Sequence, residues 1–256
     1  MARLGILPAG LPAAPELLQP GTLWRLLAPI DAYSRPRGMG LATQVAAGRV
    51  LRLREGGQPP APGSAGGRLR VRLLEDGYPC WIEPTDLLGR AVASEVPRTP
   101  RLQRPQIEAR LEAVLAAAEQ ARRQPNVYLW GGTLGPDYDC SGLIQTLFAA
   151  QGIWLPRDAY LQERFCRPVA VRPGSTALLH PGDLIFFGTA RRCTHVALHL
   201  EGGRYLHSSG REHGRNGIGI DDLSPSNQDP VSCHYRAELR GAGRVLHCHD
   251  GSPCGD

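Results

Sequence analysis

The sequence predicts an α+β protein, with a strand-rich N-terminal region followed by a domain in which helices precede antiparallel strands. The first observation is alternation: Leu69, Val71 and Leu73 are separated by arginines, as in a strand with one buried face. Similar short stretches recur between residues 22 and 88, which indicates a small barrel. The second observation is order, because helical periodicity comes first in the rest of the chain and strands joined by glycine turns follow.

Changes in proline, glycine and arginine content indicate where the domains begin and end. The expected parts are a leader at 1–20, a β-barrel at 21–90, a linker at 91–105, a second domain at 106–247 and a tail at 248–256. Within the barrel region, GGQPPAPGSAGG at 56–67 has the composition of an exposed loop insertion.

Charge and composition exclude several classes of protein. The net charge of +5 comes from arginines that are scattered rather than clustered, so nucleic acid is not an expected partner. No apolar run is long enough for a membrane span, and prolines interrupt the apolar leader, which makes it a poor signal peptide. The 7 cysteines are irregularly spaced, as is usual for free thiols in a reducing compartment, so we expect a cytoplasmic protein. We also expect a monomer. The cysteines and histidines near the C-terminus match no closed zinc pattern, and we expect no metal.

The second domain is predicted to begin with two helices. Residues 106–124 repeat apolar residues at helical spacing and end before Pro125. The next helix begins at Cys140 and ends near Gly152, which suits a C-terminal cap. The strands DLIFFG, THVALHLEGG, RYLHSS and GIGIDDL follow, and GRVLHC at 243–248 is expected to add an edge strand.

The position of Cys140 at a helix start suits nucleophilic chemistry. A helix N-terminus lowers the pKa of a thiol through its unpaired N–H groups and its dipole, and the same N–H groups can bind an oxyanion. Gly142 is expected to keep the first turn open, so that substrate reaches the sulfur. The alternative is an inert structural thiol, which is common at such positions.

Two histidines are candidates for the base that a cysteine nucleophile needs. His195 and His207 lie on predicted strands joined by a tight glycine turn, so both can face the same side. Val196 and Leu198 would occupy the opposite face of their strand. His195 would take the thiol proton and His207 would orient His195. The alternative is that both are polar strand residues unrelated to Cys140, because spacing alone does not bring the three together.

Six motifs of the second domain occur in one order: YLWGG at 128–132, DCSGL at 139–143, LPRD at 155–158, HPGDLIFF at 180–187, HVALHL at 195–200 and YLHSS at 205–209. In this order they resemble the NlpC-type papain-like cysteine peptidases of bacterial cell-wall metabolism. The resemblance covers residues 106–247. It implies a papain-like α+β fold in which Cys140 is the nucleophile, His195 the base and His207 the third polar residue, with no cofactor.

The N-terminal region extends this resemblance. LATQVAAGRVLRL and LLEDGYPCWIEPTDL are similar to the bacterial SH3-like domain that precedes the peptidase in cyanobacterial members. Those members resemble γ-D-glutamyl-diaminopimelate endopeptidases, which cut murein stem peptides that carry a free N-terminal L-Ala. The resemblance therefore implies a murein peptide as substrate and a role in cell-wall peptide recycling.

The same resemblance implies three residues that bind substrate. Asp139 and Ser141 flank the nucleophile, and Tyr78 of the SH3-like domain would close the pocket. The structural alternatives are an N-cap for Asp139 and a barrel-rim aromatic for Tyr78. Arg157 would either contact substrate or fix its loop through a salt bridge.

Two other functions remain open at this point. One is a different peptidoglycan amidase or an acyltransferase on the same fold, which would differ in its leaving group. The other is a non-catalytic wall-binding protein built on the SH3-like domain, for which an intact Cys140, His195 and His207 would be unnecessary.

Overall fold

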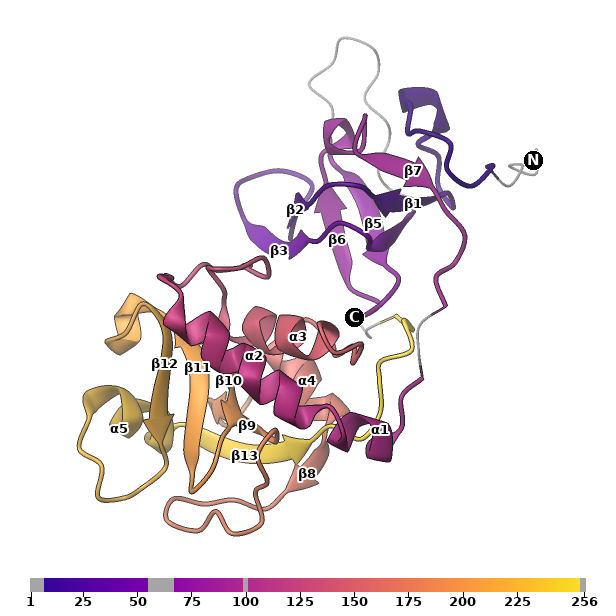
Figure 1. The fold of residues 1–256 in the computed structure, drawn as a ribbon. Coiled ribbons are helices and arrows are strands. Elements are labelled where there is room, and N and C mark those ends of the chain that lie inside the picture. The colour runs from indigo at the N-terminus through magenta and orange to yellow at the C-terminus, as the bar shows by residue number, and fades with distance from the viewer. Residues whose placement is uncertain (1–6, 55–66, 99–100, 254–256) are drawn as a thin grey trace. The chain divides into compact units, whose positions relative to one another are not determined.

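The computed structural model describes residues 7–54, 67–98 and 101–253, so nearly all of the predicted loop insertion at 56–67 lies outside the described residues. The chain divides into two compact units (Figure 1). The first comprises residues 1–99 together with 250–256, and the second comprises residues 100–249. The boundary near residue 100 falls within the predicted linker.

The first unit consists of short antiparallel strands. These are β1 (Leu23–Leu26), β2 (Ile30–Tyr33), β3 (Leu41–Val45), β4 (Val50–Leu53), β5 (Leu69–Leu73), β6 (Pro79–Ile82) and β7 (Ala91–Ala93), with 3₁₀-helices η1 (Pro15–Leu17) and η2 (Pro84–Asp86). Within the described residues they form a sheet in the order β3-β2-β6-β5-β4-β1-β7. Strand β5 buries Leu69, Val71 and Leu73 and leaves Arg70 exposed, as the alternation predicts.

Strand β7 and residues 7–20, both outside the predicted barrel, pack in this unit. Strand β7, at the start of the predicted linker, pairs with β1. Residues 7–20, predicted as an irregular leader, place Ala13 and Leu18 in the core, and Pro12 forms a bridge with Val92. Sequence reading missed both contributions because the partners are far apart along the chain.

The turn between β5 and β6 carries Tyr78 and is held by buried ion pairs. Arg49 contacts Glu75 (Nε to Oε2, 3.2 Å) and Asp76 (Nη2 to Oδ1, 2.8 Å). Asp76 Oδ1 accepts a hydrogen bond from Tyr78 N (3.1 Å), and Tyr78 O accepts one from Leu73 N (2.9 Å). The backbone of Tyr78 is therefore fixed, and its ring packs partly on the core of this unit.

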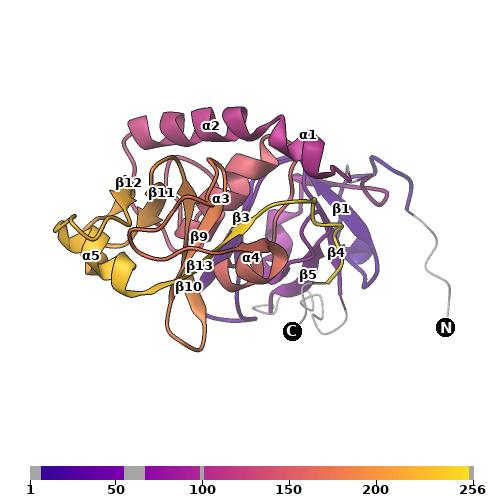
Figure 2. The same ribbon diagram turned by 90° about the horizontal axis from the view of Figure 1, so that it is seen from below.

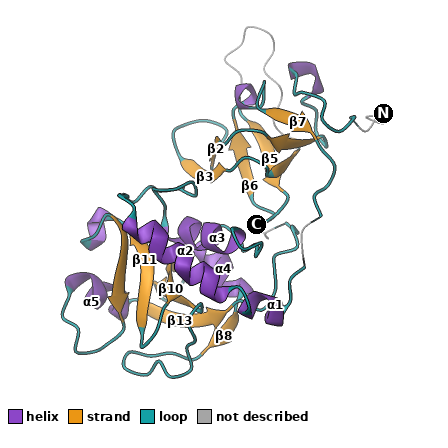
Figure 3. Cartoon of the chain, in the orientation of Figure 1, coloured by secondary structure: helices purple, strands orange, loops and turns teal. Residues whose placement is uncertain are grey.

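The second unit combines helices with one antiparallel sheet (Figure 3). Its described elements are α1 (Arg104–Glu108), α2 (Leu111–Arg123), α3 (Cys140–Ala149), α4 (Ala159–Phe165), β8 (Arg167–Val169), β9 (Leu184–Gly188), β10 (Cys193–His199), β11 (Arg204–Ser209), η3 (Arg211–His213), β12 (Gly217–Asp222), α5 (Pro230–Ala237) and β13 (Leu239–Arg244). The sheet order is β12-β11-β10-β9-β13-β8. The predicted α+β class is confirmed.

The helices cover the two faces of this sheet unequally (Figure 2). Helices α2, α3 and α4 share a core with one face, which includes Phe186, Val196 and Leu198. Helix α5 shares a smaller core with the opposite face, which includes Phe187 and Tyr205. Among the described residues, no helix has both the length and the apolar character needed to cross a bilayer.

Two predicted elements differ from the structure, and two helices were not predicted. The helix expected at 106–124 is split into α1 and α2 by a turn at residues 109–110, and a capping box between Gln103 and Gln106 starts α1. The strand expected at 243–248 is β13, which begins earlier and lies between β9 and β8 rather than at an edge. Helices α4 and α5 were not predicted.

Strand β12 lies at one edge of the described sheet. Its outward Ile218 N–H donates to Asn126 Oδ1 (2.7 Å), and its Asp222 N–H donates to Ser232 Oγ (3.5 Å). The side chains of Asn126 and Ser232 thus occupy positions that a further strand would need.

Candidate active site

Cys140 is the first residue of α3, and Asp139 is the N-cap that starts this helix. Asp139 has an extended backbone (φ −85°, ψ 176°), and its Oδ1 accepts a hydrogen bond from Gly142 N (2.6 Å). An N-cap carboxylate satisfies an N–H group that lacks a helical partner. Asp139 therefore makes the N-cap contact that the sequence offered as the structural alternative to substrate binding.

Gly142 allows the chain to cross the start of α3. A Cβ on Gly142 would lie 2.1 Å from Gly132 O and 2.9 Å from Thr133 Cγ2. Gly132, in the Trp-Gly-Gly turn, therefore passes closely over the start of this helix. The expectation that Gly142 leaves room for substrate is wrong, since the Gly132 carbonyl fills that space.

Arg157 joins Asp139 and Ser141 in a buried cluster. Its Nη2 lies 2.6 Å from Asp139 Oδ2, and its Nη1 lies 3.1 Å from Asp139 Oδ1 and 2.9 Å from Ser141 Oγ. Asp139 Oδ2 also accepts from Gly131 N (2.8 Å). Arg157 is only 2% exposed, so the salt-bridge alternative for this residue is the one observed. Both carboxylate oxygens of Asp139 already have protein donors, and its contact with substrate stays a prediction.

Burial sets the protonation of the Cys140 thiol. It raises the pKa of Cys140 to about 12, and the nearby Asp139 charge adds to this effect. Hydrogen bonds from the backbone N–H groups of Val196 and Ser141 and the charge of Arg157 oppose it without overcoming it. The expected lowering by the helix N-terminus is therefore outweighed, and the resting residue is a neutral thiol.

Strands β10 and β11 bring His195 and His207 together. They form a hairpin, and His195 Nε2 lies 2.7 Å from His207 Nδ1. Val196 and Leu198 point into the core with α3, as predicted, whereas His195 lies against Tyr235 of α5. Cys140 is linked to this strand through the Val196 N–H group, directly after His195. In the described structure, the sulfur and the His195 ring are not hydrogen-bonded to each other.

The chain of hydrogen bonds continues beyond His207. His207 Nε2 lies 2.7 Å from Asp221 Oδ2 on β12, which pairs with β11. Burial lowers the pKa of His195 well below 6.5, and the neighbouring His207 adds to the shift. Burial also lowers the pKa of His207, although its hydrogen bond to Asp221 opposes this. Both imidazoles are therefore neutral near pH 7.

Helix α5 packs against these hydrogen-bonded residues from the sheet face opposite to α3. Tyr235 stacks on His195 (ring centroids 4.3 Å apart) and meets His207 edge-on (4.8 Å). Its hydroxyl is hydrogen-bonded to Ser209 Oγ (2.7 Å). One turn earlier on the same helix face, Ser232 Oγ donates to Asp221 Oδ1 (2.9 Å).

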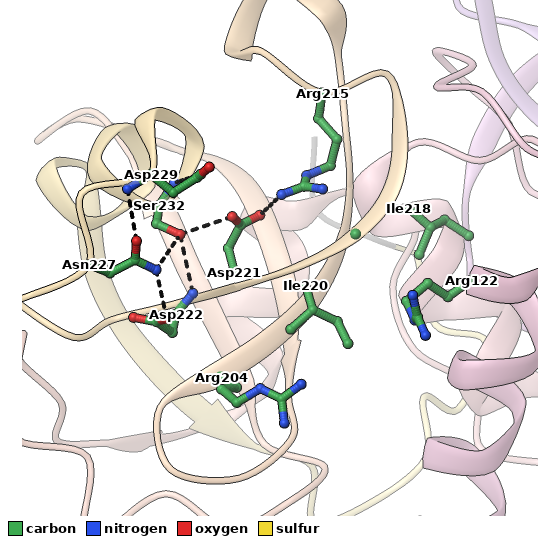
Figure 4. Close-up of a pocket in the computed structure, with 11 residues that line it drawn as sticks. Arg122, Arg204, Arg215, Ile218, Ile220, Asp221, Asp222, Asn227, Asp229 and Ser232 are labelled. Atoms are coloured by element: carbon green, nitrogen blue, oxygen red, sulfur yellow. Dashed lines mark hydrogen bonds and ion pairs between the residues drawn. The ribbon is translucent and has the colours of Figure 1, made fainter.

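A polar pocket of about 640 Å³ borders Asp221 (Figure 4). Ser232 and Arg215 reach this carboxylate from opposite sides, and Arg215 Nη2 lies 2.7 Å from Oδ2. Arg122 of α2 and Arg204 of β11 also line the pocket. The carboxylate at the end of the hydrogen-bonded chain is thus next to solvent-accessible space while being only 5% exposed itself.

The sequence of the second unit matches the model of a known family. The description of this family is "NlpC/P60 family", and the matched residues are 125–236. Residues 125–236 form an NlpC/P60 family domain. Residues 32–87 match a second family, described as the bacterial dipeptidyl-peptidase Sh3 domain. The resemblance inferred from the motifs is confirmed for both parts.

Curated proteins of known name are similar to part of this chain. The chain is 33% identical over 139 residues to the bifunctional muramidase/DL-endopeptidase CwlT of Bacillus subtilis, which is 52% of this chain and 36% of that protein. It is 38% identical over 84 residues to the gamma-D-glutamyl-L-lysine dipeptidyl-peptidase of Bacillus subtilis, which is 32% of this chain and 27% of that protein. The chain therefore spans about a third of the length of these relatives.

Solved structures are also similar to this chain. An NlpC/P60 family protein from Bacillus cereus has a TM-score of 0.44 and 22% identity, covering 88% of this chain and 64% of that chain.

Of the predicted site residues, Cys140, His195, His207, Asp139 and Ser141 all lie within the NlpC/P60 domain. Tyr78 lies in the other unit, in the turn described above, within the residues that match the Sh3 domain. Its role in closing the pocket stays a prediction.

Sequence reasoning missed three residues of the NlpC/P60 domain. The sequence showed Asp221 only as part of a predicted strand. In the structure Gly219 lies opposite His207, and Asp221, two residues later on the same strand, is on the same face of the sheet as His207. Tyr235 lies on a helix that was not predicted. Tyr128 belongs to the YLWGG motif, and burial, with the charges of Cys140 and Asp139 adding to it, raises the pKa of its phenol, so this hydroxyl is neutral.

Proposed function

We propose that this protein is a cysteine endopeptidase that hydrolyses the γ-D-glutamyl–diamino acid bond of murein stem peptides. The observation that carries the proposal has two parts: the sulfur of Cys140, at the start of α3, accepts a hydrogen bond from the N–H group of Val196, the residue after His195, and His195 and His207 are hydrogen-bonded to each other. A wall-binding protein without activity would not need this buried arrangement, which costs desolvation of polar groups.

The first half of the reaction forms a thioester. Because Cys140 is a neutral thiol and His195 is neutral, the S–H proton moves to His195 as the sulfur attacks the γ-carbonyl carbon. The S–C bond forms and the carbonyl oxygen becomes an oxyanion. Backbone N–H groups at the start of α3 and the Tyr128 hydroxyl are the donors proposed for it. When the C–N bond breaks, His195 gives its proton to the leaving amine.

The second half releases the glutamyl product. Water loses a proton to His195 and adds to the thioester carbonyl carbon. The S–C bond then breaks, the product leaves as a carboxylic acid, and the sulfur recovers its proton from His195. No cofactor is needed in this sequence.

The substrate class is supported by similarity rather than by the geometry. One relative is named a DL-endopeptidase and another a gamma-D-glutamyl-L-lysine dipeptidyl-peptidase. The matched Sh3 domain is named for bacterial dipeptidyl-peptidases, which supports a requirement for a free N-terminal L-Ala. In the proposal Tyr78, Asp139 and Ser141 contribute to recognition of this amine, since buried polar groups that only an ammonium satisfies would reject an amide.

A role in recycling of murein peptides in the cytoplasm is part of the same proposal. Its support is that the described cysteines are all free thiols, as is usual in a reducing compartment.

The test is mass spectrometry of L-Ala-γ-D-Glu-meso-diaminopimelate incubated with the protein. The L-Lys analogue and the N-acetylated peptide run in parallel, and Cys140→Ala is the inactive control. We expect release of the free diamino acid from the free-amine peptides by the wild type alone. Equal cleavage of the acetylated peptide would overturn the proposed amine requirement and indicate an enzyme that acts on intact wall. Binding to murein without any cleavage would overturn the enzyme and favour the wall-binding protein.

A further inference from the structure

The buried carboxylate of Asp221 ends the line of hydrogen bonds that starts at His195. His195 Nε2 meets His207 Nδ1, and His207 Nε2 meets Asp221 Oδ2, both at 2.7 Å. His207 is fully buried and Asp221 is 5% exposed, so water does not replace these partners. Each ring nitrogen in this line therefore has to be either a donor or an acceptor toward one defined neighbour.

A carboxylate at the end of this line determines where the protons lie. An ionised carboxylate only accepts, so His207 Nε2 must carry the proton of a neutral ring. His207 Nδ1 is then an acceptor, and His195 Nε2 must donate to it. This leaves the lone pair of a neutral His195 on Nδ1, which has no hydrogen bond within the described residues and is free to accept the thiol proton.

We propose that Asp221 is a positioning residue that, through His207, fixes His195 in the tautomer whose Nδ1 acts as the catalytic base. Asp221 touches neither substrate nor the sulfur, and it acts only by setting the direction of both hydrogen bonds. The role assigned to the base rests on the proposed function, whereas the tautomers themselves can be tested without a substrate.

The surroundings of Asp221 keep it ionised. Burial alone would raise the pKa of this carboxyl, but the His207 hydrogen bond, the Arg215 charge and the Ser232 hydrogen bond lower it below its usual value of 3.8. Arg215 is in turn placed across Gly219, where a Cβ would lie 2.1 Å from Arg215 Nη1. Gly219 lies opposite His207 on the paired strands. Because Gly219 has no side chain, the Arg215 guanidinium has room beside His207 and Asp221.

The neighbouring Asp222 provides a matched control. It lies next to Asp221 on β12 and lines the same pocket, but its oxygens accept from Ser224 N (2.8 Å) and Asn227 Nδ2 (2.7 Å). The alternation of the strand points its side chain away from His207. Asp221→Asn and Asp222→Asn therefore remove one charge each at adjacent positions, and only the first touches the histidine pair.

The first measurement is ¹⁵N NMR of histidine-labelled full-length protein near pH 7.5. We expect the Nε2–H tautomer for both His195 and His207 in the wild type and in Asp222→Asn. In Asp221→Asn the amide can donate to His207 Nε2, so we expect a shift of both rings toward the Nδ1–H tautomer. Wild-type rings with a proton on Nδ1, or tautomers unchanged in Asp221→Asn, would overturn the proposal.

The second measurement is the rate at which iodoacetamide alkylates Cys140, followed by peptide mass spectrometry. We expect Asp221→Asn to slow this rate by about 10-fold or more and to lower kcat more than it raises KM, by analogy with a base held in the wrong tautomer. Arg215→Gln, which keeps the acceptor, should slow it only a few-fold. An Asp221→Asn protein that is folded by circular dichroism and alkylated as fast as Asp222→Asn would contradict the proposal. If alkylation changes as expected and no murein peptide is cut, the proposed substrate fails while the role of Asp221 stands.

Discussion

Two buried aspartates of the second unit have similar partners and different effects. Asp139 contacts Arg157 and Ser141, and Asp221 contacts Arg215 and Ser232. The remaining donors to Asp139 are the backbone N–H groups of Gly131 and Gly142, whereas the remaining donor to Asp221 is an imidazole. The first carboxylate therefore fixes the backbone around the nucleophile, and the second fixes protons on the base.

The two arginines differ in burial, which gives the first and largest prediction. The Arg157 side chain is 2% exposed and that of Arg215 is 28% exposed. Arg157→Met leaves a buried carboxylate without its cation and should lower the free energy of unfolding by about 3–5 kcal/mol. Arg215→Met should lower it by about 1 kcal/mol or less, because solvent screens the partly exposed guanidinium and Asp221 keeps its hydrogen bonds to His207 and Ser232.

Urea denaturation of both variants measures this difference. Asp139→Asn combined with Arg157→Met should be less destabilised than the sum of the single variants, because the unpaired charge is removed. Equal losses for Arg157→Met and Arg215→Met would show that burial of the pair does not distinguish the two carboxylates.

Two glycines sharpen the comparison, with a smaller expected effect. A Cβ at either Gly142 or Gly219 would lie 2.1 Å from its nearest atom. At Gly142 that atom is the backbone oxygen of Gly132, which cannot move away alone, so Gly142→Ala should cost about 1–3 kcal/mol of stability. At Gly219 it is the end of the flexible Arg215 side chain, so Gly219→Ala should fold with near wild-type stability.

Activity separates these glycine variants further. Gly219→Ala should displace Arg215 from Asp221 and lower kcat a few-fold at unchanged thermal stability. A Gly219→Ala protein as unstable as Gly142→Ala, seen by the same thermal unfolding assay, would mean that the Arg215 position is as rigid as the backbone.

The contrast between the aspartates also explains what the sequence could and could not predict. Asp139 stands next to Cys140, so its capping contact is local and could be read from the order of residues. His195 and His207 were paired correctly because a short hairpin connects them. Asp221 comes 14 residues after His207, and only the strand register shows that it faces the same side. The direction of the Cys140 pKa was missed because burial depends on tertiary packing.

The smallest expected effect is on the pH dependence. Burial lowers the pKa values of His195 and His207 below 6.5, so both stay neutral at that pH, and the acid limb of Cys140 alkylation should lie below pH 6.5. The free energy of unfolding should also fall as pH decreases through 6.5, because the unfolded chain then binds protons that the folded rings exclude.

Rates of alkylation between pH 5 and 9 test the first point, with Cys193 as an internal control. Burial likewise raises the pKa of Cys193 to about 12, but its hydrogen-bond partners within the described residues are backbone groups of His195 (Sγ to O, 3.3 Å) and Phe187, and no imidazole is among them. An acid limb above pH 7 for Cys140 would show that the histidine pair is not held neutral.

The covered edge of the sheet has a consequence for solubility at high concentration. An edge strand with free N–H groups is a template on which another copy of the chain can add a strand. Strand β12 carries Asp221 at such an edge, and Asn126 and Ser232 accept from the outward N–H groups of Ile218 and Asp222. Asp221, which orients the histidines, can therefore lie on an edge strand of the described sheet, because these two outward N–H groups are already bonded and do not pair with a second copy.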